Sequence, residues 1–187
     1  MCGRYTLFTD EEYQDIRKII RAVQEKGHEV KTGEIYPTNP APILVWEGKE
    51  TVPQAVKWGW PKFQGSGVLI NARAETAEEK NLFRKSVYTR RCVVPTTGFY
   101  EWDQEKAKYR FILPHASTLY LAGLYNEFQG ERRSLILTTE ANASVSFIHS
   151  RMPVIIFREM IDTWLEDTEK AVQMLHWQQP ELHIATQ

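Results

Sequence analysis

The second half of the chain is a succession of short apolar segments, and these constrain the fold more than any other feature. Each segment is rich in β-branched or aromatic residues and is bounded by turn-forming residues. The segments span residues 92–95, 99–103, 109–113, 119–124 and 134–138. Segments of this kind predict β-strands joined by tight turns. We therefore expect a mostly antiparallel sheet that is curved or closed like a barrel.

The first half of the chain predicts a long helix and further strands. Thr9 and Glu12 have the spacing of a capping box, apolar residues then recur at helical spacing, and Gly27 follows. This pattern predicts a helix over residues 10–26. Strands are expected at 43–46, 51–58, 68–70 and 154–157, a shaped loop at the proline-rich residues 36–42, and shorter helices at 77–86, within 141–148, at 159–165 and at 169–175. With no linker or internal repeat, the prediction is one α+β domain over residues 1–187, with helices flanking the sheet.

Composition excludes several classes of protein. Hydrophobic residues make up 42% and charged residues 25% of the 187 residues, which is typical of a globular domain. The net charge of −1 gives no overall basic field, so a nucleic acid must be held by a local patch. The two cysteines lie in different contexts and no cysteine–histidine spacing suggests zinc, so we expect no disulfide framework, metal or cofactor. Without a signal peptide or a long apolar stretch, the chain is expected to be cytoplasmic, with no membrane partner. We also expect it to be a monomer.

The N-terminal pentapeptide Met1-Cys2-Gly3-Arg4-Tyr5 carries unusual chemistry. Methionine before a small side chain is usually trimmed, which leaves Cys2 with an α-amine beside its thiol. The ordinary pKa values are about 7.7–8.0 for the amine and about 8.5 for the thiol, so fractions of both are nucleophilic near neutral pH. An aldehyde can condense with the amine, and the thiol can then close a thiazolidine ring. The alternative is that Cys2 belongs to a frayed chain end.

Three further polar clusters lie in apolar or turn-rich surroundings. Asn71 follows a predicted strand, Glu101 lies between Tyr100 and Trp102, and His149 precedes another strand. A carboxylate against aromatic rings, a histidine and an amide suit proton transfer and the orientation of a polar substrate. Each cluster has a structural alternative. Asn71 can be a turn or a helix cap, Glu101 the solvent face of a strand, and His149 a structural histidine.

Taken together, the motifs form a recognisable series. Their order is MCGRY, PTNPAP, KWGWPKF, NARAET, RRCVVPTTGFYEW, AGLY and IHSRMPVII. This series closely resembles the SOS-response-associated peptidase (SRAP) family, the abasic-site processing proteins. The resemblance runs from Cys2 to about Phe157, and the remaining residues carry no usable motif. One departure is Ser150, where an acidic residue is more usual, and it affects the setting of His149.

The resemblance implies a domain that binds single-stranded DNA and traps abasic sites. In this family an exposed N-terminal cysteine bonds covalently to the ring-opened sugar. The corresponding roles here are nucleophile for Cys2, contact with the abasic sugar for Asn71, general acid and base for Glu101, and assistance to ring opening for His149. The resemblance thus implies a lyase-like crosslinking enzyme. The family is also credited with autopeptidase activity at the N-terminus.

The same resemblance places DNA near particular side chains. Arg4, Arg73 and Arg151 match arginines expected near the phosphates, and the basic residues Arg84, Lys85, Arg90 and Arg91 lie near the site motifs. The loop that contains Asn39, and the segment that begins at Trp58, offer rigid surfaces for bases. Trp58 and Trp60 can equally be core residues. At least one of them is expected to be buried, because they flank Gly59 in a strand-like segment.

Other functions use the same features differently. An N-terminal-nucleophile cysteine hydrolase, including an autopeptidase, uses the α-amine as the base for the Cys2 thiol and needs no DNA-facing arginines. A noncatalytic module for single-stranded DNA tolerates the loss of Cys2. A protease that acts on other proteins needs a substrate cleft that the sequence does not indicate.

Overall fold

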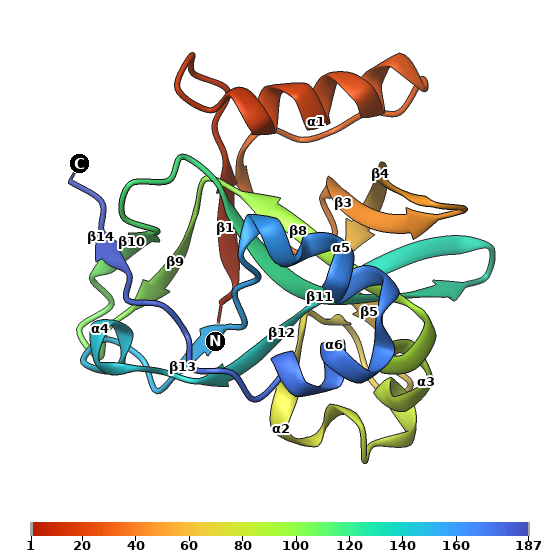
Figure 1. Ribbon diagram of the computed structural model, residues 1–187. Helices are drawn as coiled ribbons and strands as arrows, with labels where there is room; N and C mark the ends of the chain where they lie inside the picture. The colour runs from red at the N-terminus through yellow and green to blue at the C-terminus, as the bar shows by residue number, and fades with distance from the viewer. Residues whose placement is uncertain (1, 187) are drawn as a thin grey trace.

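Five strands of the computed structural model, which describes residues 2–186, close into a barrel (Figure 1). They are β3 (Pro40–Glu47), β4 (Glu50–Trp58), β8 (Arg91–Thr96), β11 (Leu119–Phe128) and β12 (Glu131–Glu140). Their order is β11-β8-β3-β4-β12, and β11 also pairs with β12, which completes the ring. Only the β4–β12 pair of this ring is parallel. The expected α+β fold with a mostly antiparallel, barrel-like sheet and flanking helices is confirmed.

A second sheet lies beside the barrel and carries the start of the chain. It consists of β14 (His183–Ile184), β10 (Lys108–Ile112), β9 (Gly98–Trp102), β1 (Arg4–Leu7) and β2 (Gly33–Ile35), in that order. Two short strands flank β12, with β7 (Asn71–Arg73) parallel to it and β13 (Arg151–Pro153) antiparallel. The strands β5 (Trp60–Pro61) and β6 (Val68–Leu69) form a small ribbon of their own.

Strand β8 of the barrel is buried on both of its faces. All residues of β8 are buried, and its side chains alternate between two apolar clusters. Cys92 and Val94 join one cluster with Trp58, whereas Val93 joins the other with Trp60. This double burial explains why β8 reads as a continuous apolar run in the sequence rather than as an alternating one.

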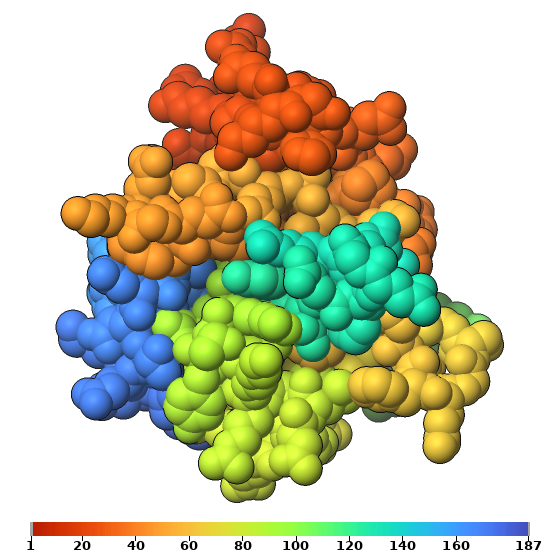
Figure 2. Space-filling model, turned by 90° about the vertical axis from the view of Figure 1, so that its right-hand side faces the viewer, coloured from red at the N-terminus to blue at the C-terminus, as the bar shows by residue number. Residues whose placement is uncertain are grey.

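Helices cover the outside of the barrel. They are α1 (Gln14–Glu25), α2 (Ala74–Ala77), α3 (Asn81–Thr89), α4 (Ala143–Ser146), the 3-10 turn η1 (Arg158–Met160), α5 (Ile161–Glu166) and α6 (Thr168–Met174). Figure 2 shows α1 at the top of the molecule above the β3–β4 hairpin, with α3 lower down beside the C-terminal helices. No helix within residues 2–186 is long and apolar enough to span a membrane.

The predicted helix starts and one predicted strand are wrong in detail. The first helix begins at Gln14 rather than near residue 10, and no side chain caps its N-terminus. The predicted capping box fails because residues before Tyr13 form a turn, in which the Tyr13 amide donates to the Asp10 carbonyl. The predicted helix at 77–86 is divided into α2 and α3. The strand expected at 154–157 lies instead at β13, and a single bridge joins Ile155 to Leu121.

The proline-rich segment was predicted to be a loop, but its second half is part of strand β3. Pro40 and Pro42 lie opposite Lys57 and Ala55 of β4. The Pro40 carbonyl accepts a hydrogen bond from Lys31, so its backbone faces away from β4. Proline is tolerated there because the missing N–H lies on the side where β3 pairs with β8 only at Leu44.

A candidate active site at the start of strand β1

Three chain segments place Cys2, Asn71 and Glu101 together. Strand β1 pairs with β9 so that Arg4 lies opposite Tyr100, which places the next residue of β9, Glu101, beside the first residues of the chain. Asn71 in β7 donates a hydrogen bond from Nδ2 to the Cys2 carbonyl at 3.0 Å. Glu101 is near enough that its charge contributes to the pKa of the Cys2 thiol. The fold thus joins three of the four predicted catalytic residues.

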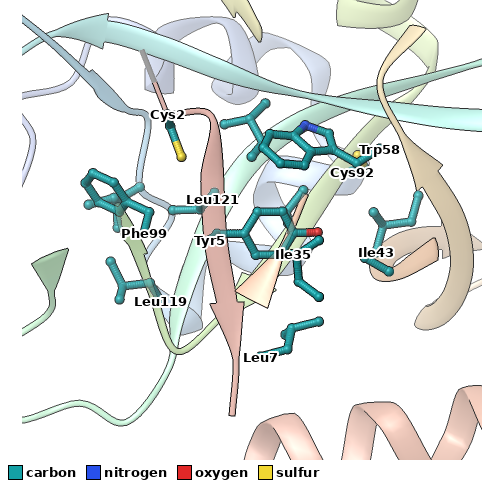
Figure 3. Packing of buried hydrophobic residues seen from close by; sticks show 14 of the residues in the cluster. Cys2, Tyr5, Leu7, Ile35, Ile43, Trp58, Cys92, Phe99, Leu119 and Leu121 are labelled. Carbon is teal, nitrogen blue, oxygen red and sulfur yellow. The ribbon is translucent and has the colours of Figure 1, made fainter. Parts of the chain in front are cut away.

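Cys2 is not exposed, in contrast to the expectation from the family. Its side chain is fully buried in the cluster that contains Phe99 and Leu121, and Figure 3 shows the sulfur directed into this cluster. Its Sγ lies 3.7 Å from the Arg4 carbonyl oxygen. Burial, and secondarily the charge of Glu101, raise the pKa of the thiol far above its ordinary value. The thiol is therefore protonated at neutral pH, and the expected thiolate fraction is absent in this conformation.

Glu101 is buried, so the alternative that it forms the solvent face of a strand is wrong. Its exposed fraction is 2%, while Tyr100 and Trp102 are partly exposed on the opposite side of β9. Burial raises the pKa of this carboxyl to about 7. The direction agrees with the sequence argument, but the neighbouring aromatic side chains are not its cause because they face away. A carboxyl with this pKa exchanges protons readily near neutral pH.

Asn71 is neither a turn residue nor a helix cap, because it lies within β7 and pairs with Ile136 of β12. The side chain is buried, and its Oδ1 has no hydrogen-bond partner among the described residues. A buried amide oxygen without a partner is costly unless a ligand or water satisfies it. This oxygen is therefore available to accept a hydrogen bond from a polar ligand.

His149 lies between α4 and β13, half-buried, and its Nδ1 accepts a hydrogen bond of 3.0 Å from the backbone N–H of Arg151. Burial lowers the pKa of His149, so the ring is neutral at pH 7. An open hollow of about 710 Å³ lies beside it. Trp102, Phe147 and His149 are among the residues that line this hollow. The hollow thus extends from His149 to the neighbour of Glu101.

The predicted DNA-binding arginines differ in what they contact. Arg4 forms an ion pair with Glu34 at 3.2 Å and lies over the ring of Tyr36. Arg151 forms a two-fold ion pair with Glu75. Arg73 is exposed and has no ion pair within residues 2–186. Among these arginines, Arg73 therefore presents the guanidinium group that is most available to a phosphate.

Trp58 does not present a ring face to DNA, contrary to the prediction. Its exposed fraction is 1%, and its indole N–H donates to the Ile70 carbonyl at 3.1 Å. Trp60 is buried to the same extent, in the other cluster. Gly59, at φ +115°, turns the chain between β4 and β5, and a Cβ there would lie 2.6 Å from Val68. This turn sends the two indoles into separate cores.

Two other residues predicted to lie near DNA use their side chains in hydrogen bonds within the protein. Asn39 accepts a hydrogen bond at Oδ1 from the Tyr36 amide at 3.0 Å, which holds the proline-rich turn. Arg91 is buried and donates to the carbonyls of Trp164 and Leu165. Arg84 and Lys85 are exposed on α3, as a DNA contact requires.

The fold also brings to this site residues that no sequence motif indicated. Phe147 is 64% exposed and lines the hollow beside His149, and Tyr36 is 42% exposed beneath the guanidinium of Arg4. Both lie in loops next to recognised motifs, and this position could have indicated them as site residues. Glu75, within the NARAET motif, contacts Arg151 of the last motif, and no local pattern indicates that pairing. The described residues hold no group of three or more acidic, histidine or cysteine side chains suited to a metal ion.

Comparison with known proteins identifies the family of this fold and site. The model of the family "SOS response associated peptidase (SRAP)" matches residues 1–186, and the chain belongs to this family. The abasic site processing protein YoqW of Bacillus subtilis is 34% identical over 185 residues, which cover 88% of this chain and 80% of YoqW. The abasic site processing protein HMCES of Xenopus tropicalis is 28% identical over 57% of this chain and 41% of its own length.

Solved structures share the same architecture. A protein from Bordetella bronchiseptica matches with a TM-score of 0.77 at 22% identity, over 98% of each chain. A protein from Bacteroides thetaiotaomicron matches with a TM-score of 0.75 at 23% identity, over 99% of this chain and 92% of the other. At this level of identity the likeness establishes the fold alone.

Proposed function

We propose that this protein is an abasic-site sensor in the DNA damage response, which binds single-stranded DNA and forms a covalent thiazolidine crosslink through Cys2. Membership of the SRAP family and the similarity to proteins named for abasic site processing support a role at abasic DNA. The observation that carries the finer proposal is the convergence of Cys2, Asn71 and Glu101 from separate segments. The protein acts as a cytoplasmic monomer in this proposal.

In the first chemical step the nucleophile is the α-amine of Cys2 rather than its thiol. Loss of Met1 gives Cys2 a free α-amine, whose ordinary pKa is about 7.7–8.0. The buried thiol is protonated, so it is a poor nucleophile at the start. The amine therefore attacks the aldehyde of the ring-opened sugar first, and the product is an imine with release of one water.

The second step closes the ring. The thiol sulfur adds to the imine carbon, its proton passes to the Glu101 carboxylate, and the imine nitrogen gains a proton. The net change is one aldehyde and one aminothiol converted into one thiazolidine and one water, with no oxidant or reductant. A carboxyl whose pKa is about 7 accepts and returns a proton near neutral pH. Glu101 is thus suited to both directions of the reaction.

Asn71 and His149 act on the sugar in this proposal. Asn71 holds the Cys2 carbonyl with its amide N–H, and its unpartnered Oδ1 accepts a hydrogen bond from a sugar hydroxyl. His149 accepts at Nδ1, so its neutral ring carries the remaining proton on Nε2. That N–H donates to the sugar oxygen as the ring opens.

The buried position of Cys2 adds a requirement. The sulfur has no exposed surface, so the first residues must shift for it to reach an imine carbon. This shift must release the hydrogen bond from Asn71 to the Cys2 carbonyl and withdraw the sulfur from its apolar cluster. Crosslinking is therefore expected to be slower than DNA binding and to depend on this opening.

The hollow and its surroundings suit a single strand more than a duplex. Trp102 and Phe147 line it and offer rings on which unpaired bases can stack. Arg73 is exposed, forms no ion pair among the described residues, and supplies a charge for the phosphates. Base stacking of this kind tolerates any sequence and requires bases that are not paired with a second strand.

A denaturing gel tests this proposal. The mature protein is incubated with single-stranded DNA that carries one abasic site, with undamaged single strand and abasic duplex as controls. A shifted covalent band with the abasic single strand alone is expected. Turnover of small amides without any such band would favour the N-terminal hydrolase, and intact-mass measurement would show whether Met1 is absent.

A further inference from the structure

Glu75 links three parts of the chain near the site. Its Oε1 accepts hydrogen bonds from Arg151 Nη1 at 2.7 Å, from the Thr139 hydroxyl at 3.2 Å and from the Glu140 amide at 3.2 Å. Its Oε2 accepts from Arg151 Nη2 at 2.9 Å. Bonding to Arg151 holds the pKa of Glu75 at about 2, so the carboxylate is ionised throughout the physiological range. Glu75 therefore joins α2 to the end of β12 and to the first residue of β13.

Arg151 carries this connection to His149. Its Nη2 also donates to the Thr138 carbonyl at 2.7 Å, so the guanidinium is held from two sides. The backbone N–H of the same residue lies 3.0 Å from His149 Nδ1, and its carbonyl lies 3.3 Å from that nitrogen. A backbone N–H can only donate, so Nδ1 accepts, and the neutral ring is protonated at Nε2. The position of the Arg151 backbone thus sets the tautomer of the ring.

We infer that Glu75 is a positioning residue for His149, which acts by fixing Arg151 so that the ring is held with its proton on Nε2. The inference rests on the proposed function, because it matters only if His149 donates that proton to the sugar. It also changes the expectation for Arg151. Glu75 occupies the fork formed by the two terminal nitrogens of the Arg151 guanidinium, so a phosphate can bind this fork only by displacing Glu75.

The test compares Glu75→Gln and Glu75→Ala with a matched control, Glu79→Gln. Glu79 is an exposed glutamate next to α2 whose side chain forms no ion pair within residues 2–186, so its replacement removes the same charge without touching Arg151. Glu75→Gln keeps the size of the side chain and one acceptor oxygen. Glu75→Ala removes every hydrogen bond of this side chain to Arg151. Ring ¹⁵N chemical shifts of His149 report the tautomer, and crosslinking rates and affinity for undamaged single strand are measured on the same preparations.

The expected result is a wild-type ring with unprotonated Nδ1 and protonated Nε2, and mixed tautomers in Glu75→Ala. Crosslinking by Glu75→Ala should slow about 10-fold, a part of the 10²–10⁴-fold that proton-transfer groups typically supply. The crosslinking rate of Glu75→Gln should lie between those of Glu75→Ala and wild type, and the rate of Glu79→Gln should match wild type. Affinity for undamaged single strand should be unchanged or stronger in the Glu75 variants, because Arg151 is released.

Two results would overturn the inference. One is an unchanged His149 tautomer in a folded Glu75→Ala variant, and the other is equal slowing of crosslinking by Glu79→Gln. A wild-type protein that forms no crosslink would contradict the proposed function instead. The nitrogen shifts would still decide whether Glu75 sets the ring, so the two failures are distinguishable.

Discussion

The amide nitrogen of Asn71 donates a hydrogen bond to the backbone carbonyl of Cys2 at 3.0 Å. This bond joins the start of the chain to β7, which itself pairs with barrel strand β12. The start of the chain is thereby tied to the barrel. The same side chain keeps its oxygen free of hydrogen bonds to described residues, so one residue both anchors Cys2 and faces a ligand.

Replacement of Asn71 by alanine should therefore reduce crosslinking more than DNA binding. The change removes the anchor on Cys2 and the acceptor for the sugar, while the exposed arginine surface is untouched. We expect the crosslinking rate to fall about 10-fold or more, because precise placement of reacting groups carries a large share of rate enhancement. Affinity for undamaged single strand should remain within about twofold, since no phosphate contact is lost. A loss of affinity equal to the loss of rate would contradict this division of roles.

Glu101→Gln should stabilise the protein at high pH while it slows crosslinking. The folded state raises the pKa of Glu101 from 4.5 to about 7, so folding favours its protonated form. The contribution of this group to stability is therefore complete below about pH 4.5 and is lost as pH rises through about 7, a difference of about 3 kcal/mol. Glutamine cannot ionise, so urea unfolding should show a more stable variant near pH 8 and little difference near pH 4. A variant that is less stable than wild type at both values would argue against a buried carboxyl.

Trp58→Phe should affect stability and leave DNA affinity unchanged. The indole is buried and its N–H donates to the Ile70 carbonyl, which also accepts from the Ile136 amide, so phenylalanine leaves a cavity and removes one of two hydrogen bonds to that carbonyl. The expected loss is about 2 kcal/mol by urea unfolding. Affinity for single-stranded DNA should match wild type under conditions where both proteins are folded, whereas Trp102→Ala should weaken it. Weaker binding by a folded Trp58→Phe variant would restore the base-stacking role predicted from the sequence.

Arg73→Ala should weaken binding to single strands with or without a lesion. Arg73 is exposed and has no ion pair among the described residues, so it is available to one phosphate. Loss of one phosphate contact should lower the magnitude of the slope of log K against log salt by about 0.7. Lys170→Ala is the control, because Lys170 is exposed but paired with Asp167 at 2.9 Å. Equal effects of the two variants would show that Arg73 contributes only general charge.

Much of the fold was accessible from the sequence because the strands of the second half carry strong local signals. Short β-branched and aromatic runs between turn residues predicted β8, β9, β10, β11 and β12 to within a few residues, apart from the longer ends of β11 and β12. The closure of the barrel, which depends on the β4–β12 and β11–β12 pairs, is a contact between distant segments. No local pattern encodes such a pair, so the sequence predicted a barrel-like sheet but not which strands close it.

The sequence predicted which residues form the site but not that Cys2 and Glu101 are buried. The order of motifs identified Cys2, Asn71 and Glu101, and the fold brings them together. Burial was not predictable for Cys2, because the covering residues come from β9 and β11. The same limit applies to Glu101, whose inward orientation follows from the register between β1 and β9. Alternation within a strand shows which residues share a face but not which face is covered.

The thermal stability of the crosslink tests the central claim most directly. Wild-type protein and Cys2→Ala are incubated with abasic single-stranded DNA, with and without borohydride, and then heated in denaturant before electrophoresis. Wild type should give an adduct that survives heat without reductant, because a saturated thiazolidine resists hydrolysis. Cys2→Ala retains only the amine, so its adduct is an imine and should be seen only after borohydride. A heat-stable adduct from Cys2→Ala without reductant, formed as fast as that of wild type, would contradict the mechanism.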